Sequence, residues 1–140
     1  MITKHGPWEL DDDPGRVDRD AAWAFLSTEA YWGRTRSRPD FEAQCDGAWR
    51  TVGAYDAAGA TAGFARAVSD GVNFAYLADV FVTGVARGSG LGIALVRFMI
   101  DDGPGRDFRW TLFTADAHGL YARFGFAAPD ATAMVRPARG

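Results

Sequence analysis

The segment that decides the fold runs from Val82 to Val96 and reads VTGVARGSGLGIALV. Gly88, Gly90 and Gly92 stand at alternate positions in it, between two apolar stretches. Glycine has no Cβ atom, so a ligand can approach the backbone closely at these positions. The apolar residues after the glycines, GIALVRFMI, predict a helix that is covered on most sides. The segment therefore predicts a glycine-rich loop that joins a strand to a helix.

The spacing of these glycines excludes two common phosphate-binding motifs. A P-loop needs Gly-Lys followed by Ser or Thr, and the only lysine of the chain is Lys4. A dinucleotide-binding fingerprint needs a third glycine where this chain has Ile93 or Leu95. Neither kind of nucleotide site is therefore expected here.

The run from Arg87 to Gly92 nevertheless has the properties of a diphosphate site. The first amide N–H groups of a helix lack partners within the helix, and the positive end of the helix dipole lies beside them. Arg87 can add a charged guanidinium. The alternative is that the glycines serve only a tight turn and close helix packing.

The rest of the chain predicts strands and helices on both sides of this loop. We expect strands at 7–10, 49–55, 61–69, 72–82, 108–115 and 126–137, and helices at 18–32, 39–46, 92–100 and 116–125. The last helix should begin after Asp116 as N-cap and end at Gly125. This order, β-α-α-β-β-β-α-β-α-β, predicts a mixed sheet with helices on its faces, an α+β sandwich, in one domain over residues 1–140.

Composition limits the classes of partner. The net charge of the 140 residues is −3 and gives no broad basic surface, so we expect no nucleic-acid partner. No apolar run reaches the roughly 20 residues of a membrane span, so we expect no membrane partner. The aspartates from Asp11 to Asp13 lack the EF-hand spacing, so we expect no metal. Cys45 is the only cysteine. We expect it to be an inert thiol, and the protein to be cytoplasmic.

The glycine loop and a later segment together resemble the GNAT superfamily of acyl-CoA N-acyltransferases. Arg87, Gly90 and Gly92 match the loop motif Q/R-x-x-G-x-G/A, and residues 120–126 read LYARFGF. The resemblance covers about residues 49–127, and the strand and two helices before them match in order only. It implies the GNAT fold, a mostly antiparallel mixed sheet whose central strands splay apart.

The resemblance also implies acetyl-CoA as co-substrate. In the family, backbone amides of the loop bind the pyrophosphate, which implies this role here for Arg87, Gly88, Ser89, Gly90, Leu91 and Gly92. The resemblance implies that the pantetheine arm pairs with the backbone of Val80, Phe81 and Val82. It also implies contacts of the cofactor with Tyr121 and Phe124. The activity expected is acetylation of a primary amine of a small molecule or a protein by direct attack. Two alternatives are a non-catalytic domain that senses acyl-CoA and an interaction protein that keeps the fold without the cofactor. Family members are often dimers, so a homodimer is also considered, although no sequence feature fixes it.

Tyr121 is the predicted acid for the departing thiolate, because a tyrosine in this motif commonly has that role in the family. The alternative is that its ring packs in the core with Ala117 and Phe124. A backbone N–H near Phe81 or Val82 is the expected donor to the oxyanion.

Asp79 is the predicted catalytic carboxylate, with three roles left open. It could accept a proton through water, hold the ammonium group of the substrate, or anchor a neighbouring loop. The glutamate that family members often carry on this strand has no match here, and Glu29 and His118 are weaker candidates for the base. Alternation along 72–82 predicts that Asp79 shares one face of the strand with Leu77 and Phe81.

Aromatic residues lie in the region that corresponds to the acceptor-facing helices of the family. They are Trp23, Tyr31 and Trp32. We expect most of them in the core, and any that face the pocket would favour an apolar or cationic acceptor. The acidic charge balance of the chain also favours a cationic acceptor.

Overall fold

The computed structural model describes residues 1–30 and 35–139. Within them, six strands form one sheet in chain order: β1 (Ile2–His5), β2 (Trp8–Asp11), β3 (Arg50–Tyr55), β4 (Thr61–Ser69), β5 (Phe74–Val82) and β6 (Arg109–Thr111). Neighbouring strands are antiparallel except β5 and β6, which are parallel. The sheet is therefore mixed and mostly antiparallel, as predicted.

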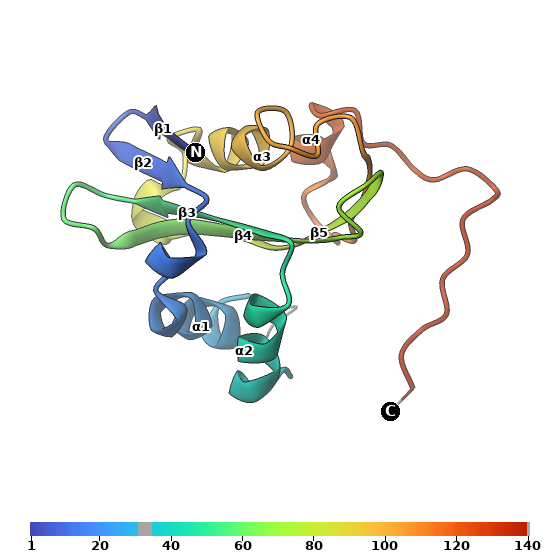
Figure 1. Ribbon diagram of the computed structural model, residues 1–140, viewed down its shortest axis with the longest axis horizontal. Helices are drawn as coiled ribbons and strands as arrows, with labels where there is room; N and C mark the ends of the chain where they lie inside the picture. Colours follow the sequence, from blue (N-terminus) through green and yellow to red (C-terminus); the bar gives the residue numbers. More distant parts are fainter. Residues whose placement is uncertain (31–34, 140) are drawn as a thin grey trace.

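Among the described residues, four helices cover the two faces of this sheet. Figure 1 shows α1 (Arg19–Thr28) and α2 (Arg38–Asp46) on one face, and α3 (Leu91–Met99) and α4 (His118–Ala122) on the other. Two 3₁₀ turns, η1 (Pro14–Arg16) and η2 (Gly84–Ala86), precede α1 and α3. The arrangement is the α+β sandwich that the sequence predicts.

The helices begin where the sequence supplies capping groups. Asp18 accepts a hydrogen bond from the Ala21 N–H at the start of α1, and Ser37 accepts one from the Asp40 N–H in α2. At α4 the predicted cap is wrong: Ala117 occupies the N-cap position, and its N–H donates to Thr114 Oγ1.

Each face of the sheet has its own apolar core. On the side of α3, the buried cluster includes Val52, Leu77, Leu95 and Phe98, and of the α3 residues only Arg97 is exposed. The prediction of a helix covered on most sides is thus confirmed. On the side of α1 and α2, the cluster includes Phe25, Leu26, Phe41, Phe64 and Phe81.

A bulge in β5 changes the predicted faces of that strand. Asp79 has φ 56°, the left-handed conformation that side chains rarely adopt. Because Ala78 pairs with Arg66 of β4 and Phe81 with Phe64, two residues of β5 stand opposite one of β4. The extra residue reverses the alternation. Leu77 therefore packs against the α3 side and Phe81 against the α1 side, and the prediction that they share one face is wrong.

The parallel strands β5 and β6 stay together over only three residues. Phe74, Ala75 and Tyr76 pair with Arg109, Trp110 and Thr111. Beyond Tyr76, no strand among the described residues pairs with this edge of β5. The predicted splaying of the central strands is confirmed, and it leaves the second half of β5 with an open edge.

The two ends of the chain differ from the prediction. Residues 2–5 form a strand that was not predicted, because the turn before Trp8 lets them pair with β2 as a hairpin. The strand predicted at 126–137 is absent: residues 127–139 are exposed and irregular, and Figure 1 shows them leaving the body of the protein. Asp130 accepts the Thr132 N–H in a turn, which interrupts extension in the middle of this segment.

The strand predicted at 108–115 is also shorter than expected, since β6 ends at Thr111 where its partner strand diverges.

Among the described residues, none of the helices combines the length and the hydropathy that a membrane span requires.

Candidate functional site

The glycine loop, residues 87–92, lies on the surface between β5 and α3. Its residues from Arg87 to Gly90 are exposed. Gly88 has φ 79° and Gly90 has φ 82°, both in the left-handed region where a side chain is strained. A Cβ at Gly88 would meet no atom within 4 Å, so it is backbone conformation and not packing that requires glycine there.

Part of the backbone of this loop is free to bind a ligand. The Arg87 N–H donates to the Gly84 carbonyl at 3.3 Å, and the Leu91 N–H donates to Ser89 Oγ at 3.2 Å. The other amides of the loop, those of Gly88, Ser89, Gly90 and Gly92, make no hydrogen bond to any residue that the structure describes. Four adjacent or nearly adjacent donors therefore remain at the start of α3, where an anion is favoured.

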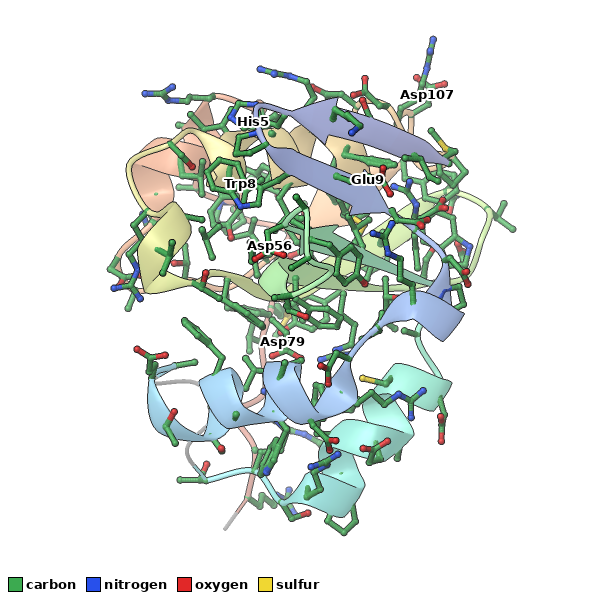
Figure 2. The ribbon with its side chains drawn as sticks, turned by 90° about the vertical axis from the view of Figure 1, so that its left-hand side faces the viewer. His5, Trp8, Glu9, Asp56, Asp79 and Asp107 are labelled. Atoms are coloured by element: carbon green, nitrogen blue, oxygen red, sulfur yellow. The ribbon has the colours of Figure 1, made fainter. Side chains whose placement is uncertain are left out.

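The N-terminal hairpin holds this loop from the side. His5 Nε2 lies 3.0 Å from the Ser89 carbonyl oxygen, and the His5 ring stacks on Trp8 at a centroid distance of 6.4 Å. Figure 2 shows His5 and Trp8 on neighbouring strands of the hairpin. Sequence reasoning missed His5, because the contact joins residues 84 positions apart and no local pattern signals it.

A cavity of about 780 Å³ lies where β5 and β6 part. Its walls come from β5, from the segment after β6, from α4 and from arginines on the α1–α2 side of the sheet; we call it the arginine cavity. It brings together Tyr121, Asp79 and Val80, three of the predicted site residues. The open edge of β5 and this cavity thus adjoin each other.

Tyr121 both packs in the core and lines the cavity. It is 8% exposed, belongs to the α3-side cluster, and meets the Phe126 ring edge-on at 5.9 Å. Phe124 and Ala117 pack against the same cluster. The two alternatives considered for Tyr121 are therefore compatible in this structure.

Asp79 is held by two arginines. Arg36 donates to both carboxylate oxygens, from Nη2 at 2.8 Å and from Nη1 at 2.9 Å, and Arg66 Nε donates to Oδ2 at 2.9 Å. The Asp79 side chain is only 2% exposed. Figure 2 shows it on the side of the sheet that α1 covers.

These contacts set the charge of Asp79. Burial raises the pKa of its carboxyl, but the hydrogen bonds and charges of Arg36 and Arg66 outweigh burial and keep that pKa below its ordinary value. The hydrogen bond to Asp79 in turn raises the pKa of Arg36. Of the three roles considered for Asp79, the contacts favour the third, in which it anchors through Arg36 the segment that leads into α2.

Neither arginine was predicted from the sequence as a site residue. Arg66 is the clearer omission, because a charged residue interrupts the apolar run AGFARAV of a strand that is buried from Ala62 to Ala67. Such a residue signals either a buried ion pair or a ligand site. Arg36 has no comparable signal, since it stands among other polar residues before α2.

The remaining candidates are less central. His118 lines the arginine cavity, with Nε2 2.9 Å from the Thr114 carbonyl, whereas Glu29 is exposed at the end of α1. Trp23 stacks on Phe41 in the core at 5.7 Å. Tyr31 and Trp32 lie outside the described residues.

Cys45 is buried, and burial raises the pKa of its thiol. The thiol therefore stays protonated, as expected of an inert cysteine. Among the described residues, no three His, Cys, Asp or Glu side chains gather in a group that could hold a metal ion.

A sheet that opens between two parallel strands, next to a glycine loop that begins a helix, is the architecture of acyltransferases of the GNAT type. Comparison with protein-family models gives the same class. Residues 17–126 match the model described as the acetyltransferase (GNAT) family. Since the match spans most of the chain, this protein belongs to the GNAT acetyltransferase family.

Solved structures support the assignment. A protein of Xanthomonas campestris pv. campestris, described as belonging to the GNAT family, is 31% identical and superposes with a TM-score of 0.86 over 94% of this chain and 93% of that one. A search of curated proteins gave no match.

Two more distant structures share the fold alone. One, from Deinococcus radiodurans R1, is 22% identical with a TM-score of 0.72, and the match covers 97% of this chain and 94% of that one. The other is glucosamine-6-phosphate N-acetyltransferase from Arabidopsis thaliana, 13% identical with a TM-score of 0.66, with 95% and 97% of the two chains covered.

Proposed function

We propose that this protein is an N-acetyltransferase that transfers the acetyl group of acetyl-CoA to a primary amine by direct attack. Membership of the GNAT family supports acyl transfer in general. The observation that carries the finer proposal is the pair of exposed left-handed glycines, Gly88 and Gly90, with unengaged amides beside them. They lie at the start of α3. The loop follows the end of β5, and residues 76–80 of the same strand line the arginine cavity.

In this proposal the amides of Gly88, Ser89, Gly90 and Gly92 bind the diphosphate of acetyl-CoA, and Arg87 adds charge from the exposed rim of the loop. The pantetheine arm pairs with the open edge of β5 at Val80 to Val82, as an added strand would. That edge leads from the glycine loop to the cavity, so the thioester would reach Tyr121.

Tyr121 would then protonate the thiolate that leaves, and a backbone N–H of Phe81 or Val82 would stabilise the oxyanion. Asp79 acts in this account as a positioning residue, because its lone pairs already accept hydrogen bonds from two arginines. The acceptor amine must attack in its neutral form. The positive charges of Arg36 and Arg66 favour that form, since a nearby like charge lowers the pKa of an ammonium group.

The second candidate is a domain that binds acyl-CoA without turnover, and the buried packing of Tyr121 is the observation that favours it. The substitution Tyr121→Phe separates the two, because it keeps the ring and removes the hydroxyl. We expect turnover to fall about 10²-fold and the Kd for CoA to stay within a factor of about two, which is smaller than the loss of one typical hydrogen bond. No turnover of any amine by the wild type would favour the binding domain, whereas an unchanged rate in the variant would remove Tyr121 as the acid.

We propose an acceptor amine on a small molecule or a protein, a cytoplasmic location, and a homodimer.

The first test of the proposed function is isothermal titration with CoA. Absence of binding at millimolar concentration would remove both the catalytic and the acyl-CoA-sensing proposal.

A further inference from the structure

We infer that the amine acceptor carries a carboxylate group, and that Arg66 binds this carboxylate in the arginine cavity. The inference rests on the proposed function, because it names the class of amine that the same site would acetylate. Three features support it: the hydrogen bonds of Arg66, those of a second buried arginine, and the charge of the cavity.

Arg66 is buried but its terminal groups are not used by the protein. The residue is 6% exposed, and its Nε donates to Asp79. Within the described part of the chain, Nη1 and Nη2 make no hydrogen bond. They are also not among the buried atoms without a partner, so they contact open space, and Arg66 lines the cavity. A guanidinium with two free amino groups is a fork that matches the two oxygens of a carboxylate.

Arg50 shows what an arginine with a purely structural role does at equal burial. It is also 6% exposed, but its Nη1 donates to the carbonyls of Phe98 and Met99 at the end of α3, and its Nη2 donates to Asp12. The terminal groups of Arg50 are therefore used by the fold. Those of Arg66 remain open toward the cavity, where a carboxylate can accept hydrogen bonds from both of them.

The charges of the cavity favour one anionic group. Among the described residues that line it, Arg36 and Arg66 are positive and Asp79 is negative, which leaves one positive charge. One carboxylate neutralises this charge, whereas a phosphate dianion would leave an excess of negative charge. The cationic acceptor that the overall charge of −3 suggested is therefore disfavoured by the local charge.

The test compares amines that carry this group with amines that lack it, and expresses kcat/KM per neutral amine, because a carboxylate also raises the pKa of a neighbouring amino group. Amino acids such as glycine and β-alanine are compared with their primary amides, with release of free CoA thiol as the readout. We expect kcat/KM to be at least about ten times higher for the acids, which corresponds to one charge-assisted hydrogen bond. Equal rates, or faster acetylation of the amides, would overturn the inference while leaving the proposed acetyltransferase activity intact.

The variant Arg66→Gln tests the assigned residue. Asp79 keeps both hydrogen bonds from Arg36 in this variant, so the fold should persist. We expect kcat/KM for the acids to fall to that of the amides measured with the same variant. Arg66→Lys should restore part of the preference, and Arg97→Gln on the exposed side of α3 should change neither. A preference that survives in Arg66→Gln would contradict the assignment.

A binding measurement makes the test independent of turnover. In the presence of CoA, the wild type should bind N-acetylglycine at least about ten times more tightly than N-acetylglycinamide, and Arg66→Gln should bind the two alike. Equal affinities in the wild type would refute the inference even if no amine is acetylated. Tighter binding of the phosphonate analogue than of the carboxylate would also refute it.

Discussion

The glycine loop and the arginine cavity lie at the two ends of the proposed acetyl-CoA path, yet they are made of different groups. The loop offers backbone amides on the surface and depends on the left-handed conformation of Gly88 and Gly90. The cavity offers side chains that are more than nine-tenths buried, Arg66 and Asp79, held by ion pairs. A backbone site is sensitive to conformation, whereas a site of buried charges is sensitive to the loss of one partner.

The largest effect on stability is expected from Asp79→Asn. Asparagine tolerates the left-handed conformation at this position, so the change removes mainly the charge. The buried Arg66 and the half-buried Arg36 would lose their anion, which should lower the free energy of unfolding by about 3–5 kcal/mol. Urea denaturation measures this effect. Asp107→Asn is the control, because Asp107 is exposed and lies 3.8 Å from Arg106, and it should change nothing. A loss below about 1 kcal/mol, which is typical of an exposed ion pair, would contradict this prediction.

The same carboxylate predicts a pH dependence of stability. The pKa of Asp79 is lower in the folded protein than its ordinary value. Its contribution is therefore complete above the unfolded pKa of about 3.9 and is lost as the pH falls toward the folded pKa. The difference in unfolding free energy between wild type and Asp79→Asn should be constant from about pH 7 to 5 and shrink below about pH 4. A difference that shrinks as the pH rises toward 7 would have the wrong sign.

A smaller effect is expected at the glycine loop from His5→Ala. The change removes the contact of Nε2 with the Ser89 carbonyl but none of the amides of the loop. Loss of one exposed hydrogen bond corresponds to about 0.5–1 kcal/mol, so CoA should bind about two to five times more weakly. Pantetheine, which has no diphosphate, should bind the variant and the wild type alike. A larger loss for pantetheine than for CoA would show that His5 acts elsewhere.

The sequence was informative for the loop for a physical reason. A backbone site needs glycine at fixed positions, and the glycines between an apolar strand and an apolar helix can be read directly. The downstream motif that contains Tyr121 is local in the same way. The coarse order of strands and helices followed from local periodicity and capping, as for Asp18 and Ser37.

The cavity could not be predicted in the same way, because its groups meet only in three dimensions. The pairing of Asp79 with Arg36 joins residues 43 positions apart. The bulge at Asp79 adds a residue that no local pattern marks, so the alternation assigned Leu77 and Phe81 to one face. The prediction of a strand at 126–137 was wrong for a related reason, since a segment forms a strand only where a sheet edge receives it.

The most direct test of the central claim, that the backbone of the glycine loop binds the diphosphate, compares two glycines. Gly88 in the loop and Gly59 in the β3–β4 turn have φ of 79° and 85°, and a Cβ at either meets no atom within 4 Å. Replacement by alanine should therefore lower stability similarly, by about 1 kcal/mol. Titration with CoA should then show Gly59→Ala binding like the wild type and Gly88→Ala binding at least about ten times more weakly, the loss of roughly one charge-assisted hydrogen bond. Equal CoA affinity of the two variants would contradict the account.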